Sequence, residues 1–191
     1  MIFDALDAGI EPGGLRSRRE IRLLVCFILA NIDQPVRREH ILTAAVEGAF
    51  ANFFEISSAV ADLLEAGNIT EDEKGFLHIT QESKESIDLL EADLPYTVRE
   101  KSTALCAKLA LREIYRKDNK AVITKSKRGY YVDCYMKAED DDDILTFRLY
   151  SGTISQAELV RERFLDDPIA IYDNLIESMF PPKKNGDPKQ S

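Results

Sequence analysis

The 191-residue chain contains no tryptophan, only two histidines and only three cysteines. Cys26, Cys106 and Cys134 are widely separated and form no CxxC pair, so we expect neither a disulfide framework nor a Cys/His zinc site. We interpret the three thiols as small buried hydrophobic groups in a reducing compartment. The sequence predicts no metal and no cofactor.

Long hydrophobic runs are also lacking. The stretch 23–30 (LLVCFILA) is much shorter than the ~18–20 apolar residues that cross a bilayer. The opening segment MIFDALDAGIEP carries acidic but no basic residues, which is atypical of a secretory signal. We therefore expect a soluble, cytoplasmic protein with no membrane partner.

Common enzyme motifs are missing. There is no GxSxG, GxGxxG or GKS/T sequence, and no predicted strand precedes Gly13-Gly14. His40 and His78 do not suggest a Ser/His or Cys/His relay. The acidic run 139–143 lacks EF-hand spacing, so we expect a charged turn there rather than a calcium loop. The sequence predicts a protein that is not an enzyme.

Breaks in composition divide the chain into four segments. Residues 1–16 form a predicted flexible arm that contains Gly and Pro. Residues 17–94 and 95–180 each have enough periodic apolar residues for a small domain. Residues 181–191 (PPKKNGDPKQS) form a polar tail that we expect to be disordered.

Segment 17–94 has the pattern of helices around a small hairpin. Ser17 and Glu20 form a capping box before a helix that ends near 32. Further helices are expected over 36–46 and 52–66, the latter with Phe53 facing inward. A hairpin over 68–79 and a helix capped by Thr80 follow. This order is typical of a winged helix-turn-helix domain.

Segment 95–180 has the pattern of a small α/β domain. A long helix is expected from Thr97 to about 117, with apolar residues on more than one face. Such a helix is typically sandwiched, either between two layers of its own chain or against a symmetry partner, and Leu105, Leu109 and Leu111 are the predicted dimer contacts. Alternating strands over 121–150 predict an antiparallel meander covered by this helix. Two helices over 155–180 complete a chain of the α+β class.

Three segments resemble an uncharacterised bacterial family, the domain of unknown function numbered four-three-six-four. They are LLVCFILANIDQPVRREHI, NFFEISSAVADLLEAGNI and FLDDPIAIYDNLI, and the likeness runs from about Ile21 to Phe180. The resemblance implies a winged helix before a small α/β domain, and a transcriptional regulator by analogy of fold. A weaker resemblance to PadR- and MarR-like regulators covers the first half only.

The third helix of such a domain enters the major groove of DNA. The residues that we expect to contact double-stranded DNA are Arg18, Arg19, Arg37, Arg38, Asn52, Ser57, Ser58 and Lys74. Residues 1–95 hold 8 basic against 18 acidic residues, and no Lys or Arg lies between Arg38 and Lys74. A homodimer would double the few arginines available for phosphate contacts.

Two alternatives remain open. The arginines of the first half could instead pair with Glu20, Glu39 and Glu47. The negative charge of the first half and the carboxylates of the third predicted helix also favour a protein interaction module that does not bind DNA. Residues 99–128 hold ten basic and three acidic residues, and their hairpin TKSKRGYY is either a solvated turn or, less favoured, a nucleic-acid contact.

Overall fold

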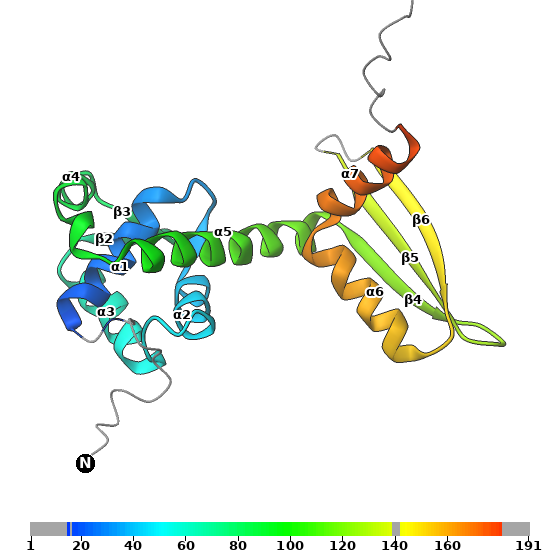
Figure 1. The fold of residues 1–191 in the computed structure, drawn as a ribbon, viewed down its shortest axis with the longest axis horizontal. Helices are drawn as coiled ribbons and strands as arrows, with labels where there is room; N and C mark the ends of the chain where they lie inside the picture. The colour runs from blue at the N-terminus through cyan, green and yellow to red at the C-terminus, as the bar shows by residue number, and fades with distance from the viewer. Residues whose placement is uncertain (1–14, 16, 139–141, 181–191) are drawn as a thin grey trace, which may run out of the picture. The chain divides into compact units, whose positions relative to one another are not determined.

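The computed structural model describes residues 15, 17–138 and 142–180. The described chain is of the predicted α+β class, with seven α-helices and two three-stranded antiparallel sheets (Figure 1). It divides into two compact units, Met1–Leu111 (the N-terminal unit) and Arg112–Ser191 (the C-terminal unit). The predicted tail, most of the predicted arm and residues 139–141 of the acidic run lie outside the described residues.

The N-terminal unit follows the predicted order of helices and hairpin, with one additional strand. Its elements are α1 (Arg18–Asn31), β1 (Val36–Arg37), α2 (Arg38–Glu47), α3 (Phe53–Glu65), β2 (Ile69–Glu71), β3 (Phe76–Ile79), α4 (Gln81–Leu90), a short 3-10 helix (Glu91–Asp93) and the first turns of α5 (Tyr96–Asp118).

Strand β1 corrects the predicted start of the second helix. Val36 pairs with Leu77 and Arg37 with Phe76, so these two residues are extended and α2 begins only at Arg38. The resulting sheet has the order β1-β3-β2. Burial of the Val36 side chain in the core stabilises this short pairing.

Two of the predicted helix starts have different outcomes. The Ser17 capping box is confirmed, because the Ser17 hydroxyl accepts from the Glu20 N–H at 3.1 Å and the Glu20 carboxylate accepts from the Ser17 N–H. Thr80 occupies the N-cap position of α4, as predicted, but its side chain makes no capping hydrogen bond, because the hydroxyl donates to the Asn68 carbonyl instead. Leu15 is buried and its N–H donates to the Phe50 carbonyl at 2.8 Å, so this residue of the predicted flexible arm is fixed against the core.

Helix α1 is the centre of the N-terminal core. Its buried residues lie on more than one face of the helix and include Leu23, Cys26 and Phe27. The reason is that α1 contacts α3, α4 and β3, so more than one of its faces is covered.

The start of α5 belongs to the same core. The helix begins at Tyr96, one residue before the predicted Thr97, and Val98 and Cys106 are buried among the residues of α1 and its neighbours. The two units therefore meet between residues 111 and 112, not at the predicted boundary of 94 and 95.

Two of the three predicted dimer contacts on α5 lie against this core. Leu105 and Leu109 are half-buried and pack against the N-terminal unit, while Leu111 is half-buried. Packing within their own unit accounts for the apolar character of Leu105 and Leu109 without a second chain.

The C-terminal unit contains the predicted antiparallel meander. Its elements are the end of α5, β4 (Lys120–Lys125), β5 (Tyr130–Lys137), β6 (Asp143–Ser151), α6 (Ile154–Asp166) and α7 (Pro168–Met179). Val132, Cys134 and Met136 alternate along β5 and are buried on one face of the sheet, as predicted. The long helix was expected to cover this face, but Ala157 and Phe164 of α6 complete its core. Figure 1 shows α6 alongside the sheet.

Among the described helices, none combines the length and hydropathy needed to span a bilayer.

Candidate nucleic-acid interface

Helix α3, the predicted recognition helix, is fixed at its start by Asn52. The Asn52 side-chain oxygen accepts from the N–H groups of Phe54 and Glu55 at 2.9 and 3.0 Å. These bonds satisfy two of the donors that every helix N-terminus leaves unpaired. Asn52, predicted to contact a base, thus has a capping role in the described structure.

Arg38 and Ser57 lie together, and their contact joins α2 to α3. Arg38 Nη2 donates to the Ser57 hydroxyl at 2.9 Å and to the Ser57 carbonyl at 3.0 Å. Both residues were predicted to contact DNA. Here the guanidinium sets the position of α3 relative to α2.

Arg37 connects the start of α2 to the hairpin β2–β3. Its guanidinium carbon lies 4.2 Å from the centre of the Phe76 ring, and Nη1 donates to the Lys74 carbonyl. Its backbone N–H donates to Nδ1 of His40, whose side chain is buried. Arg37 therefore orients the hairpin, and His40 lies in the interior of the domain.

The hairpin turn is organised by Asp72. Its Oδ1 accepts from the N–H groups of Lys74 and Phe76, both at 2.9 Å, and its Oδ2 lies 3.2 Å from His78 Nε2. The hydrogen bond from the Phe76 backbone and then that from His78 lower the pKa of Asp72. Lys74 lies exposed at the tip of this turn.

Three arginines of α1 pair with acidic side chains of the same unit. Arg22 lies 3.5 Å from Asp62. Arg18 and Glu55 are 3.8 Å apart, and Arg19 lies 2.7 Å from Asp93. None of these acids is among the predicted partners. Two of them lie on α3, so α1 partly neutralises the negative charge of the predicted recognition helix.

Four predicted residues remain accessible. The side chains of Arg18 and Arg19 are 80% and 73% exposed despite their ion pairs. Ser58 and Lys74 are exposed as well. The N-terminal unit thus offers Arg18, Arg19, Ser58 and Lys74 to a partner, while Arg37, Arg38, Asn52 and Ser57 hold its elements together.

Sequence reasoning missed an exposed aromatic pair at the start of α3. Phe53, predicted to be buried, is 52% exposed, and Phe54 is 79% exposed. Their rings meet edge to face with centres 5.7 Å apart. Phe50 and Ala51, just before α3, are buried in the core instead. The adjacent Phe-Phe pair beside a polar N-cap is the signal that could have identified this surface.

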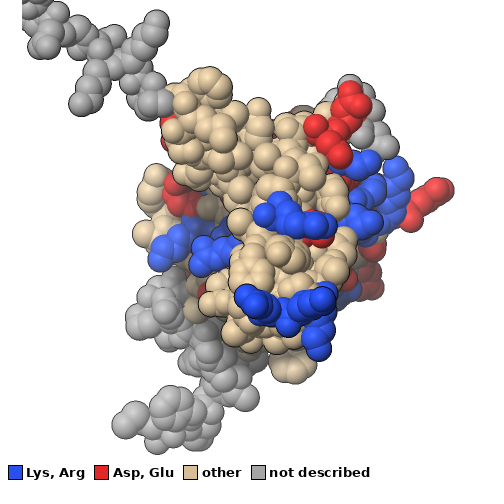
Figure 2. Space-filling view, turned by 90° about the vertical axis from the view of Figure 1, so that its right-hand side faces the viewer, with Lys and Arg blue, Asp and Glu red and all other residues tan. Residues whose placement is uncertain are grey.

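The basic hairpin of the C-terminal unit separates its two tyrosines. Tyr130 packs against the core of that unit, whereas Tyr131 lies on the opposite face with its ring centre 5.6 Å from that of Tyr150. Arg148 lies over Tyr131 and donates to Asp133, one of the two bonds being 3.1 Å long. Figure 2 shows Lys and Arg side chains scattered among uncharged residues on the face that is turned to the viewer.

The three cysteines are buried, as predicted. Burial raises the pKa of the Cys26 and Cys134 thiols to about 11 and that of Cys106 to about 12. The thiols are therefore protonated at neutral pH and poorly nucleophilic. Within residues 15, 17–138 and 142–180, no three metal-ligating side chains come together.

Comparison with known proteins identifies one family. No curated protein and no solved structure matches the chain. The family described as "Domain of unknown function (DUF4364)" matches residues 21–179, which is most of the chain and includes both units. The protein therefore belongs to the DUF4364 family.

Proposed function

We propose that the protein is a cytoplasmic, homodimeric transcriptional regulator whose N-terminal unit is a winged helix that binds double-stranded DNA. The observation that carries this proposal is the order of α1, α2 and α3 followed by the β2–β3 hairpin, within the sheet β1-β3-β2. In a helix-turn-helix the second helix of the motif enters the major groove. In this chain that helix is α3, and the hairpin is the wing.

The contacts of Arg37 and Arg38 support the proposal in a way that sequence reasoning did not foresee. Arg38 fastens α3 to α2, and Arg37 fastens the hairpin to α2. A recognition helix and a wing held by such bonds are pre-organised, which reduces the entropy that binding costs. The phosphate contacts then come from Arg18, Arg19 and Lys74, with Ser58 as a further hydrogen-bonding group.

Direct binding tests the proposal. Labelled fragments of genomic DNA are titrated with the full chain, and fluorescence anisotropy is followed between 50 and 200 mM salt. Six phosphate contacts per dimer predict an affinity loss on the order of 10³ over this range. A flat response at low salt would contradict the proposal.

A substitution in the wing localises the contact. Lys74→Ala removes one phosphate contact from each protomer, so the slope of log affinity against log salt should become shallower by about 1–2. Lys84→Ala is the matched control, because Lys84 is an exposed lysine on α4. Equal slopes for the two variants would remove the wing from the interface.

The exposed Phe53-Phe54 pair favours a second candidate, a protein interaction module without DNA affinity. Aromatic side chains are enriched at the centres of protein interfaces, and Glu55 adjoins this pair. In this case Phe54→Ala and Glu55→Lys release a protein partner isolated with the wild-type chain. Under the DNA hypothesis Glu55→Lys instead raises DNA affinity, so one variant separates the two candidates.

A further inference from the structure

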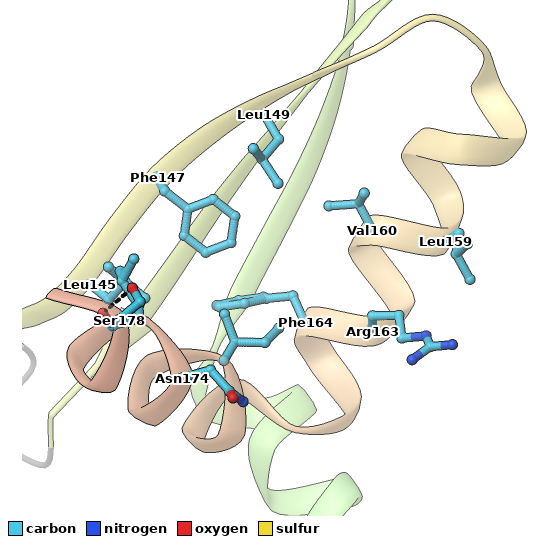
Figure 3. A pocket seen from close by; sticks show the side chains of 11 residues that line it. Leu145, Phe147, Leu149, Leu159, Val160, Arg163, Phe164, Asn174 and Ser178 are labelled. Atoms are coloured by element: carbon cyan, nitrogen blue, oxygen red, sulfur yellow. Dashed lines mark hydrogen bonds between the residues drawn. The ribbon is translucent and has the colours of Figure 1, made fainter. Parts of the chain in front are cut away.

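An apolar cleft lies in the C-terminal unit between β6, α6 and α7. Its volume is about 690 Å³. Figure 3 shows Phe147, Leu149, Val160 and Phe164 pointing into it from the sheet and from α6. Asn174 and Ser178 also line it, but they donate to the carbonyls of Ala170 and Leu175 in their own helix. Apart from Arg163, the side chains that line the cleft thus present hydrocarbon or polar groups that are bonded within their own helix.

The opposite face of α7 is apolar as well. Ile169, Ile176 and Phe180 are 43%, 37% and 72% exposed. Ile169 and Ile176 are seven residues apart and therefore lie on one side of the helix, and Phe180 follows as the C-cap residue, whereas Ile171 and Leu175 face the cleft. A helix with two apolar sides is typical of an element that is covered from both directions.

The charges on the two surfaces are complementary. Arg163 lines the cleft on α6, and its guanidinium has no hydrogen-bond or ion-pair partner among the described residues. Asp173 and Glu177 are exposed on the outer side of α7, at spacings that place them beside Ile169 and Ile176, and likewise have no partner in the described chain. The cleft therefore carries an unpaired cation, and the outer face of α7 carries two unpaired anions.

The two acidic residues of α6 that are nearest to Arg163 in the sequence already have basic partners. Glu162 accepts a bond from Arg116 that lowers the pKa of its carboxyl group. Asp166 also accepts from Arg116, at 3.0 Å, and pairs with Arg112. Because Glu162 and Asp166 are paired with other arginines, Arg163 is available for an ion pair with an acidic side chain from outside the unit.

Two other possible occupants of the cleft, the C-terminal segment of the chain and a small molecule, match its surroundings less well than a second copy does. Residues 181–191 have the sequence PPKKNGDPKQS and contain no Leu, Ile, Val, Met or aromatic side chain to fill the cleft. A small molecule in the cleft would leave Ile169, Ile176 and Phe180 in water. A second copy of the chain supplies a complementary surface for both faces at once, as a two-fold interface requires.

We propose that two copies associate through this cleft, with the outer face of α7 of each copy packed into the cleft of the other. Arg163 of one copy then pairs with Glu177 or Asp173 of the other. This interface deepens the homodimer assumed in the proposed function and replaces the dimer contacts predicted on α5. Its test contains no DNA, so it can fail or succeed independently of DNA binding.

Sedimentation velocity of the full chain at 1–100 µM provides the test. We expect a dimer for the wild type and a monomer for Leu159→Glu and Ile176→Glu, which place a carboxylate on the cleft wall and on the outer face of α7. Both residues are exposed in the single chain, so the variants should keep its fold. Leu89→Glu, at an exposed leucine of α4, is the matched control and should remain dimeric.

Charge reversal identifies the pairing. Arg163→Glu and Glu177→Arg should each weaken the dimer about tenfold or more, and the double variant should recover most of the loss. A wild-type chain that is monomeric at 100 µM would overturn the proposal. Binding of an apolar probe such as anilinonaphthalene sulfonate to the cleft of that monomer would show that the cleft exists but is not a dimer interface. A dimer that survives both Leu159→Glu and Ile176→Glu would overturn it as well, because the copies would then meet elsewhere.

Discussion

Arg38 Nη2 donates to both the hydroxyl and the carbonyl of Ser57, at 2.9 and 3.0 Å. One guanidinium nitrogen thus holds two atoms of a residue nineteen positions further along the chain. The bonded carbonyl lies in the first turns of α3, so the contact fixes both the position and the rotation of this helix. A sequence-based assignment of Arg38 to phosphate binding overlooks this internal role.

Arg38→Ala should lower the free energy of unfolding by about 1–3 kcal/mol, because a partly buried, charge-assisted bond pair is lost. Ser57→Ala removes only the bond to the hydroxyl and should cost about 0.5–1.5 kcal/mol. Urea denaturation followed by circular dichroism measures both values. Ser58→Ala is the control, since Ser58 is exposed and should change stability by less than about 0.5 kcal/mol. An unchanged midpoint for Arg38→Ala would show that the contact contributes nothing.

Asp72 should make the N-terminal unit sensitive to acid. Because the folded pKa of Asp72 lies below its unfolded value, the unfolded chain binds more protons between the two values. The ionised Asp72 carboxylate therefore stabilises the folded state above the unfolded pKa of about 3.9. This stabilisation is lost as the pH falls through the folded pKa. Asp72→Asn keeps the acceptor for the Lys74 and Phe76 N–H groups but cannot titrate.

The stability of Asp72→Asn should consequently fall less steeply than that of the wild type as the pH drops below about 4. Urea midpoints measured from pH 6 to pH 2.5 give the comparison. Glu73→Gln, which removes a negative charge from the same turn, is the control. Parallel curves for the wild type and Asp72→Asn would contradict the assigned hydrogen bonds.

Two backbone positions should respond in opposite directions to exchange of glycine and alanine. Gly67 ends α3 with a φ of 72°, and a Cβ there would meet no atom within 4 Å. Gly67→Ala should therefore cost about 1 kcal/mol through backbone conformation alone. Ala49 has a φ of 52° without being glycine, so Ala49→Gly should be neutral or stabilising by up to about 1 kcal/mol. Thermal unfolding of the two variants side by side checks both signs.

Local signals in the sequence were sufficient for most helices. The Ser17–Glu20 capping box depends only on neighbouring residues, and it appears as expected. Strand β1 could not be found in this way, because two residues have no periodicity. Its partner Leu77 lies about forty residues further along the chain. The sequence therefore predicted that the second helix begins at Val36, whereas α2 begins at Arg38.

Tertiary contacts decide the roles of the site residues. The spacing of Phe53 from Ile56 suggests a shared inward face, but Phe50 occupies the core ahead of α3 and Phe53 remains exposed. Arg19 and Asp93 pair across 74 positions. Such pairings determine which arginines are available to a partner, and no local pattern records them.

The ion pair between Arg22 and Asp62 offers a final test of the electrostatics of α3. Asp62→Asn removes a negative charge from the predicted recognition helix and frees a guanidinium 3.5 Å away. Both side chains are solvent-accessible, so the stability change should stay below about 1 kcal/mol. If α3 faces DNA, the affinity for DNA should rise and the slope of log affinity against log salt should steepen by about 1 per protomer, because Arg22 can then neutralise a phosphate.

Glu82→Gln, at an exposed acid of α4, is the control for net charge alone. Equal gains in the two variants would reflect only the overall charge, whereas loss of a protein partner from Asp62→Asn would favour the interaction module.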